Sequence, residues 1–174
     1  MAEEPEHVDG GELAHVAAYL RFYRETVVAR CRALPDAERR RPRLPSGWTP
    51  LELLQHLAHM ERRWLVWGFL GEAVDAPWGD NAAGEPDAPW QVEPETSLDD
   101  VVAFLDEVAA RTETVLASAS PEDLAATGGR FRAGPGMPEL PTLRWICLHV
   151  LQEYARHAGH LDVVVELAGG PTGE

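Results

Sequence analysis

Four long segments of this sequence carry the hydrophobic periodicity of an α-helix, and this feature most restricts the fold. They span residues 11–34, 49–70, 97–119 and 142–168. Apolar side chains that recur every three or four positions lie on one face of a helix. Signals typical of β-strands are poor throughout the chain. Four long amphipathic helices with connecting loops predict an all-α protein with a four-helix bundle architecture.

Local capping signals support the ends of these helices. Thr49 is a good N-cap, Pro50 suits the first helical position, and Glu52 completes a capping box with Thr49. Ser97 is placed to cap the third helix. The Gly-Gly-Pro sequence at residues 169–171 is typical of a helix end. We therefore expect helix boundaries close to the limits given above.

Two long connections separate the predicted helices. Residues 71–96 are rich in Pro, Gly, Asp and Ala and contain the tripeptide Ala-Pro-Trp twice. A loop of this length in a compact domain is usually functional or mobile. Its Trp78 and Trp90 either pin the loop against the helices or line a substrate pocket as part of a lid. Residues 128–141 form a second loop that could supply the opposite wall of such a pocket.

Charge and length limit the classes of function. The 174 residues include 15 basic and 29 acidic side chains, a formal net charge of −14. This balance argues against binding nucleic acid or an anionic membrane through bulk charge. Residues 1–10 are acidic and poor in apolar side chains, so we expect a flexible tail rather than a signal peptide.

No apolar run in the sequence approaches the roughly 20 residues of a membrane helix. We therefore predict a cytoplasmic protein with a single domain over residues 11–170 and no nucleic-acid or membrane partner. The expected partner is a small-molecule substrate. The apolar surfaces of a helix bundle could also support a homodimer.

The two cysteines, Cys31 and Cys147, fall within predicted helices and lie far apart in the sequence. Two cysteines without a C-x-x-C motif do not form a disulfide framework. We expect both to behave as small buried side chains rather than as catalytic nucleophiles.

The stretch HVLQEYARHAGHLD, residues 149–162, contains His149, Glu153, His157 and His160. Since each helical residue turns by about 100°, steps of four, four and three place these side chains within an arc of about 80°. Glu153 and His157 then present a carboxylate and an imidazole side by side, as helical metal sites do. The alternative is that they simply pair on a solvated face.

A third ligand would have to come from another helix. His56 lies near the middle of the second predicted helix among apolar neighbours, so we expect it to face inward. Two histidines and one carboxylate form an open site for a divalent metal, with Zn as first choice and Ni, Fe or Mn also reasonable. His59 is an alternative ligand, whereas His149 and His160 could orient the ligands from outside.

Two stretches, GWTPLELLQHLAHMERRWL and TLRWICLHVLQEYARHAGHLDVVVELAGG, resemble the DinB-like superfamily. The similarity runs from about residue 14 to residue 170. More narrowly, it resembles the actinobacterial branch that includes mycothiol-dependent enzymes such as maleylpyruvate isomerase. The resemblance implies a four-helix bundle of up-down-down-up order.

The same resemblance implies a metal triad. The family's usual ligands are a histidine on the second helix and an H-x-x-x-H pair on the last, and the matching positions are His56, Glu153 and His157. Glu153 departs from the usual histidine. The same carboxylate variant occurs in enzymes resembling mycothiol-dependent maleylpyruvate isomerase, so the departure is compatible with a metal site.

The activity that the resemblance implies is that of a thiol S-transferase or isomerase, which uses a low-molecular-weight thiol such as mycothiol on a small electrophile. A free thiol has a pKa near 8.5 and is mostly protonated at neutral pH, whereas a divalent cation deprotonates a coordinated thiol. On this hypothesis Arg63, Arg144 or Arg156 binds an anionic group of the substrate or cofactor. Nothing in the sequence chooses among these three arginines.

Two other functions fit the same residues. One is metal-assisted hydrolysis, in which the metal binds water and Glu153, His160 or another pocket residue serves as base. The other is a non-catalytic, stress-associated metal-binding protein, because a fold does not determine a function. A requirement for a thiol separates transfer from hydrolysis, and metal content separates both from a protein that binds no metal.

Overall fold

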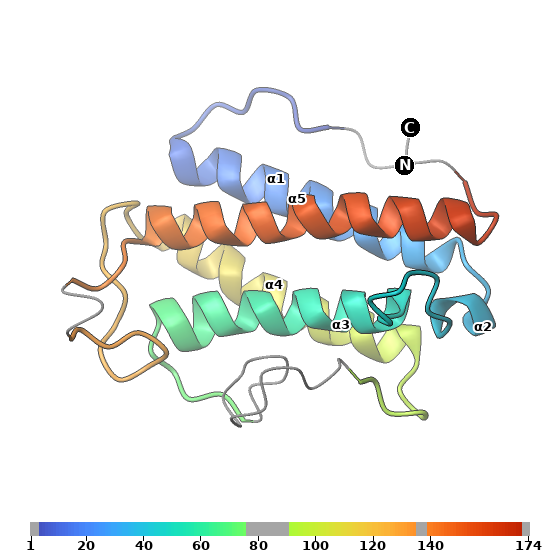
Figure 1. Ribbon diagram of the computed structural model, residues 1–174. Coiled ribbons are helices and arrows are strands. Elements are labelled where there is room, and N and C mark those ends of the chain that lie inside the picture. Colours follow the sequence, from blue (N-terminus) through green and yellow to red (C-terminus); the bar gives the residue numbers. More distant parts are fainter. Residues whose placement is uncertain (1–3, 76–90, 135–138, 172–174) are drawn as a thin grey trace.

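The computed structural model describes residues 4–75, 91–134 and 139–171 (Figure 1). Within these ranges the chain is all-helical, and an isolated antiparallel bridge joins Leu124 to Thr142. The helices are α1 (Glu12–Arg32), α2 (Asp36–Arg39), α3 (Pro50–Glu61), the π-helix η1 (Arg62–Phe69), α4 (Leu98–Ser118) and α5 (Leu143–Leu167). The all-α prediction is confirmed for the part of the chain that the structure describes.

The four long helices pack along one another. α1 contacts α5 and α4, and α3 contacts α4 and α5. α1 and α5 run in one direction, whereas α3 and α4 run in the opposite direction (Figure 1). This arrangement places the middle of α3 against the middle of α5, which are the helices that carry the predicted metal ligands.

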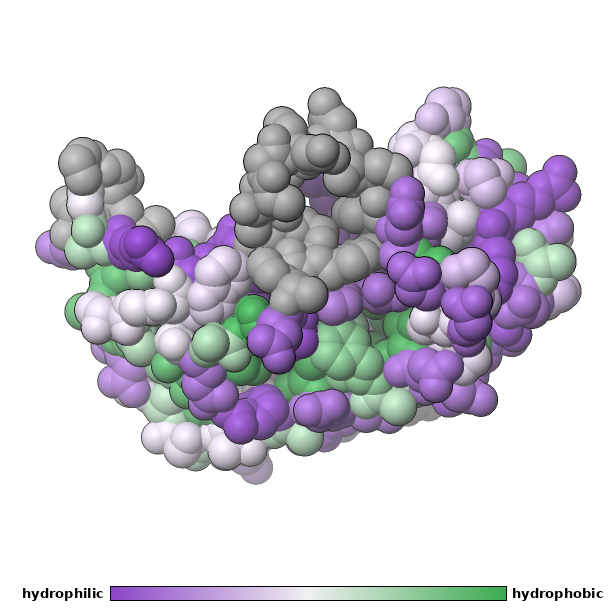
Figure 2. Space-filling view, turned by 90° about the horizontal axis from the view of Figure 1, so that it is seen from below, coloured by the Kyte–Doolittle hydropathy of each residue, from purple (hydrophilic) through white to green (hydrophobic). Residues whose placement is uncertain are grey.

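Apolar faces of these helices form a continuous core. The apolar residues that recur at helical spacing along α1 are buried at Leu13, Val16, Leu20 and Val27, while Tyr23 is half-buried and packs against the core. The surface below the view of Figure 1 carries hydrophilic residues and a group of hydrophobic residues between them (Figure 2). In the ranges that the structure describes, no helix has the length and hydropathy needed to cross a membrane.

The predicted capping box is confirmed at the start of α3. The backbone N–H of Glu52 donates to Thr49 Oγ1 at 3.3 Å, and the backbone N–H of Thr49 donates to Glu52 Oε2 at 2.7 Å. Both bonds satisfy donors that have no partner within the helix itself. Because α3 carries His56, this cap also helps to hold the beginning of the element that positions the site.

Replacing Thr49 with alanine should lower the free energy of unfolding by about 1 kcal/mol, because one orphan N–H loses its acceptor. Urea denaturation followed by circular dichroism measures this change. Thr127→Ala serves as the control, since Thr127 is exposed in a loop and belongs to no cap. A Thr49→Ala protein as stable as wild type would show that the capping box contributes nothing.

The sequence predicted one continuous helix from residue 49 to residue 70, but the structure divides it. α3 ends at Glu61, and η1 continues with wider turns, in which the N–H of Leu70 donates to the carbonyl of Leu65 at 3.0 Å. Tight packing accompanies this change, since a Cβ on Gly68 would lie 2.8 Å from the ring of Phe131. π-Helical turns within α-helices are frequently found at functional sites.

The predicted loop between the first two long helices contains the short helix α2. Pro35 precedes its first residue, and acidic side chains at Asp36 and Glu38 lie near its positive N-terminal end. A proline can stop one helix and precede another, and Pro35 lies between the end of α1 and the first turn of α2.

A buried polar cluster, which we call the Glu61 hub, joins all four long helices. Glu61 at the end of α3 is 0% exposed and accepts hydrogen bonds from Arg24 of α1, Thr112 of α4 and Tyr154 of α5. The distances are 3.0 and 2.5 Å to the Arg24 nitrogens, 2.5 Å to Thr112 Oγ1 and 2.7 Å to Tyr154 Oη. These partners compensate for the removal of the carboxylate from water.

Candidate metal centre

Three predicted ligands from two helices meet in the structure. His56 comes from α3, and Glu153 and His157 come from adjacent turns of α5. One ligand atom of each residue lies within 4.8 Å of the other two, a grouping that could hold a metal ion. The (i, i+4) spacing explains why Glu153 and His157 share a face. The packing of α3 on α5 brings His56 to that face.

The distances within this triad are consistent with three ligands that bind one shared metal ion. Glu153 Oε2 lies 3.3 Å from His157 Nε2 and 4.0 Å from His56 Nε2. The two imidazole rings have their centroids 5.0 Å apart. His56 is 7% exposed and His157 is 9% exposed, whereas Glu153 is half-buried. The triad therefore combines two buried nitrogen donors with a more accessible oxygen donor.

The protonation states suit a metal site. Burial lowers the pKa of His56, and burial together with the neighbouring His56 lowers the pKa of His157 to about 4. Interaction with His56, assisted by His157 and His149, lowers the pKa of Glu153 to about 2. At neutral pH the triad therefore offers two neutral imidazoles and one ionised carboxylate. This is the protonation state in which such side chains bind a divalent cation, so the residues fit the implied metal.

A pocket of about 490 Å³ opens onto the triad. Besides the three ligands, its lining residues are Leu44, Ser46, Trp48, Arg156 and His160. Leu44, Ser46 and Trp48 belong to the segment that leads into α3, and Arg156 and His160 belong to α5. The pocket is thus formed where the start of α3 faces the middle of α5, and its size suits a small molecule.

Trp48 is a pocket residue that the sequence analysis missed. It directly precedes the capping residue Thr49, and its ring centroid lies 6.2 Å from that of His160. A tryptophan next to the cap of the His56 helix was the signal that could have drawn attention to it. The predictions for Trp78 and Trp90 fall outside the residues that the structure describes.

The remaining histidine candidates occupy different environments. His59 lies against Phe104 of α4, with ring centroids 4.7 Å apart, and is not part of the triad. His160 lines the pocket, with its ring centroid 5.4 Å from that of His157. His149 Nε2 lies 3.7 Å from Glu153 Oε1, on the carboxylate oxygen that does not face the other ligands. Geometry therefore places His149 and His160 beside the triad and His59 away from it.

The structure distinguishes the three arginines that the sequence left equivalent. Arg144 forms ion pairs with Glu12 and Glu122, at 2.8 and 2.7 Å, near the start of α5. Arg63 is buried in η1 and does not line the pocket. Arg156 is exposed and lines the pocket. Of the three, Arg156 is the one that lines the pocket at the triad, whereas the pKa of His56 is lowered by burial and, to a smaller extent, by the charge of the buried Arg63.

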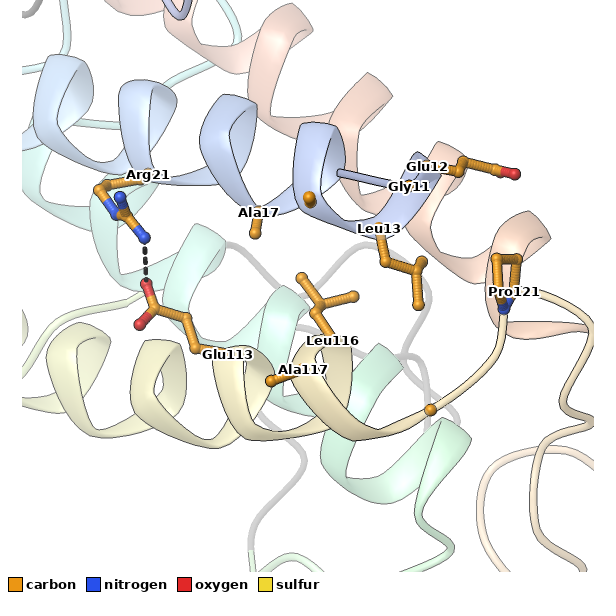
Figure 3. Close-up of a pocket in the computed structure, with 11 residues that line it drawn as sticks. Gly11, Glu12, Leu13, Ala17, Arg21, Glu113, Leu116, Ala117 and Pro121 are labelled. Carbon is orange, nitrogen blue, oxygen red and sulfur yellow. Dashed lines mark ion pairs between the residues drawn. The ribbon is translucent and has the colours of Figure 1, made fainter. Parts of the chain in front are cut away.

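A second hollow, about 580 Å³ in volume, lies between α1 and α4 (Figure 3). Small and apolar side chains such as Ala17, Ala117 and Leu116 line it, and Arg21 and Glu113 face each other across it at 3.7 Å. Because this charged pair is mutually satisfied and none of the triad residues lies there, this hollow offers less chemistry than the pocket at the triad.

Neither cysteine takes part in the pocket at the triad. Cys31 and Cys147 are both buried, and burial raises the pKa of each thiol to about 12. A protonated, buried thiol is a poor nucleophile. If a thiol reacts in this pocket, it therefore has to come from a bound molecule.

We expect the thiols of the native protein to show almost no reaction with Ellman's reagent over minutes. Unfolding in guanidinium should expose both thiols and let them react. The physical reason is that each sulfur is buried and protonated in the native state. Absorbance of the released thiolate at two pH values, neutral and mildly alkaline, provides the measurement. A thiol that reacts rapidly in the native protein at neutral pH would contradict the inert role assigned to both cysteines.

Comparison with known families supports the same region of the chain. The family model described as Mycothiol-S-transferase matches residues 15–170. No curated protein and no solved structure gave a match. The matched range includes α3, η1 and α5 and therefore all three residues of the triad. The family resemblance drawn from the sequence is thereby confirmed, and the chain belongs to the DinB-like Mycothiol-S-transferase family.

Proposed function

We propose that this protein binds a divalent metal through His56, Glu153 and His157 and uses it in mycothiol-dependent S-transfer or isomerisation of a small electrophile. The convergence of these three ligand atoms within 4.8 Å, beside a pocket, carries the proposal. The family match makes mycothiol the first thiol to test. Two imidazoles and one carboxylate favour Zn²⁺ as the first metal to test, with Ni²⁺, Fe²⁺ and Mn²⁺ as alternatives.

The metal, when bound, would lower the pKa of a thiol that is otherwise mostly protonated at neutral pH. The two histidines would present neutral nitrogens, and Glu153 would contribute the compensating negative charge. Leu44 and Trp48 would exclude water from one side of the pocket, and His160 would offer a proton-transfer group at its edge. The buried cysteines leave the nucleophile to be supplied by the thiol cofactor.

The proposal also includes the architecture that accompanies this activity in the family. We take the four long helices to be the four-helix bundle of up-down-down-up order and residues 11–170 to be one domain. The shared direction of α1 and α5, the opposite shared direction of α3 and α4, and the pairwise packing of the helices support this assignment. A cytoplasmic location fits a protein that uses a low-molecular-weight thiol, and a homodimer is compatible with it.

The decisive test is an activity screen of Zn²⁺-loaded protein with mycothiol and a panel of small electrophiles, with products identified by mass spectrometry. We expect consumption of an electrophile that requires both the metal and mycothiol. Glu113→Gln serves as the control variant and should keep the activity of wild type, because Glu113 lines the hollow between α1 and α4 and not the pocket at the triad. Metal-dependent turnover without any thiol would instead identify a hydrolase, and metal binding without turnover on any electrophile would favour a binding protein.

A further inference from the structure

We infer that the pocket at the triad takes a ligand that carries a carboxylate or a similar anionic group, and that Arg156 binds this group. The inference rests on the proposed function and adds the chemical class of the ligand. Among the described residues that line this pocket, Arg156 is the one basic side chain of the arginine or lysine type. It would act as a specificity residue by touching the bound molecule.

Arg156 is unusual among the arginines of this acidic chain. The sequence has no lysine, so all 15 of its basic residues are arginines, and they face 29 acidic residues. Most of these arginines form ion pairs, as Arg21 does with Glu113, Arg30 with Asp162 and Arg111 with Glu72. Within the ranges that the structure describes, no carboxylate lies within ion-pair distance of Arg156. Its guanidinium therefore remains available at the pocket.

Charge at the pocket favours an anion. His56 and His157 would bind a metal as neutral imidazoles, because a histidine that coordinates a cation gives up its proton. A divalent ion contributes +2, Glu153 contributes −1 and Arg156 contributes +1, which leaves +2 beside the open space. A guanidinium recognises a carboxylate through two parallel hydrogen bonds. Leu44 and Trp48 provide an apolar surface for the remainder of the molecule.

The anionic group could belong to the thiol or to the electrophile, and a binding experiment separates these sources. The protein is loaded with Co²⁺, and the thiolate-to-metal absorption band is titrated with 2-mercaptoethanol and with 3-mercaptopropionate. These probes have similar size and differ in the carboxylate. Butyrate, which has a carboxylate and no thiol, is titrated by calorimetry alone and in the presence of 2-mercaptoethanol. None of these measurements requires turnover.

We expect wild type to bind at least one carboxylate probe about tenfold more tightly than Arg156→Gln does, since one charge-assisted contact is lost. Arg156→Lys should recover part of the affinity, and Arg21→Gln should behave as wild type because Arg21 lies in the other hollow.

Competition between butyrate and 2-mercaptoethanol assigns the carboxylate to the thiol, whereas simultaneous binding assigns it to the electrophile. Equal affinities of wild type and Arg156→Gln for all carboxylate probes would overturn the inference. Absence of a thiolate band with either thiol would count against the proposed function alone, because the butyrate titration still tests Arg156.

A different observation carries a second inference: we propose that Tyr154, through Glu61, positions the metal ligands. Tyr154 directly follows Glu153 on α5, and Glu61 lies five residues after His56 on α3. The 2.7 Å hydrogen bond from Tyr154 Oη to Glu61 Oε2 therefore joins the same two helices that the triad joins. A metal site tolerates displacements of only a few tenths of an ångström. A bond that holds α5 in register with α3 should consequently affect metal affinity.

Thr112 offers a matched control for Tyr154. Its hydroxyl also donates to Glu61, at 2.5 Å, but Thr112 belongs to α4, which carries none of the three ligands. Tyr154→Phe and Thr112→Val each remove one hydroxyl from the Glu61 hub and keep most of the side-chain volume. Both should lower the denaturation midpoint of the metal-free protein by similar amounts. Only the tyrosine change should disturb the alignment of α3 with α5.

Competition with a chromophoric chelator measures Zn²⁺ affinity, and the ligand-field spectrum of the Co²⁺ form reports the geometry. We expect Tyr154→Phe to lower Zn²⁺ affinity about tenfold and to alter the Co²⁺ spectrum, while Thr112→Val leaves both within twofold of wild type. Equal effects of the two variants, or normal affinity in Tyr154→Phe, would show a structural role only. A wild type that binds no metal would overturn this inference together with the proposed function.

Discussion

Replacing His56 or His157 with alanine is expected to abolish stoichiometric metal binding. Wild-type protein purified without added metal should contain close to one equivalent, and each variant should retain almost none. Each substitution removes one of three ligand side chains from a group whose ligand atoms lie within 4.8 Å. The loss should exceed the roughly 10- to 100-fold that changes outside the ligand set cause. Inductively coupled plasma mass spectrometry measures the content directly.

The controls for this experiment are two histidines that do not belong to the triad. His59→Ala changes a residue of the same helix as His56 that lies against Phe104, and His15→Ala changes a half-buried histidine of α1. Both should keep the wild-type metal content. Glu153→Gln preserves shape and removes the negative charge, so its content should fall as well. Metal retained in His157→Ala, or absent from wild type even after reloading and desalting, would remove the basis of the thiol-activation proposal.

Replacing Glu61 with alanine should destabilise the fold by about 3–5 kcal/mol, the range seen when one member of a buried ion pair is removed. Arg24 would then keep a buried guanidinium whose nearest remaining carboxylate is that of Glu113, at 3.7 Å. Thr112 and Tyr154 would also lose their acceptor. Equilibrium unfolding in urea, with the same denaturant slope checked for each protein, measures the change.

A second variant separates loss of the carboxylate from loss of packing. Glu61→Leu combined with Arg24→Met fills a similar volume without either charge, and buried ion pairs replaced in this way are often neutral or stabilising. We therefore expect the double variant to be more stable than Glu61→Ala alone. A Glu61→Ala protein within about 1 kcal/mol of wild type would show that the Glu61 hub contributes little net stability.

The residues around Thr49 illustrate how much of the fold could be predicted from the sequence. A cap depends on side chains three positions apart, so Thr49, Pro50 and Glu52 were sufficient to place the start of α3. Helix limits elsewhere agree with the prediction to within two residues, as in α4 and α5. The change from α3 to the π-helix η1 was not predictable in this way. It accompanies contacts with distant residues such as Phe131.

The residues of the candidate site were likewise predictable only in part from the sequence. Glu153 and His157 could be paired from the sequence because one turn of helix separates them. His56 and His59 were both open candidates from spacing alone, and the orientation of α3 against α5 and α4 decided between them. Three arginines were likewise equivalent until the ion pairs of Arg144, the burial of Arg63 and the pocket position of Arg156 were known.

The sequence by itself determined the four long helical segments, the caps at Thr49 and Ser97 and the (i, i+4) pair of Glu153 and His157, because these depend on interactions between residues a few positions apart. Only the tertiary structure decided that His56 completes the group, that Trp48 and Arg156 border the pocket, and that Glu61 is buried among four helices. The physical reason is that the rotation and register of each packed helix depend on contacts with residues far away in the chain. Periodicity identifies the apolar face of a helix, but it does not identify which polar side chain at its edge will meet a particular neighbour.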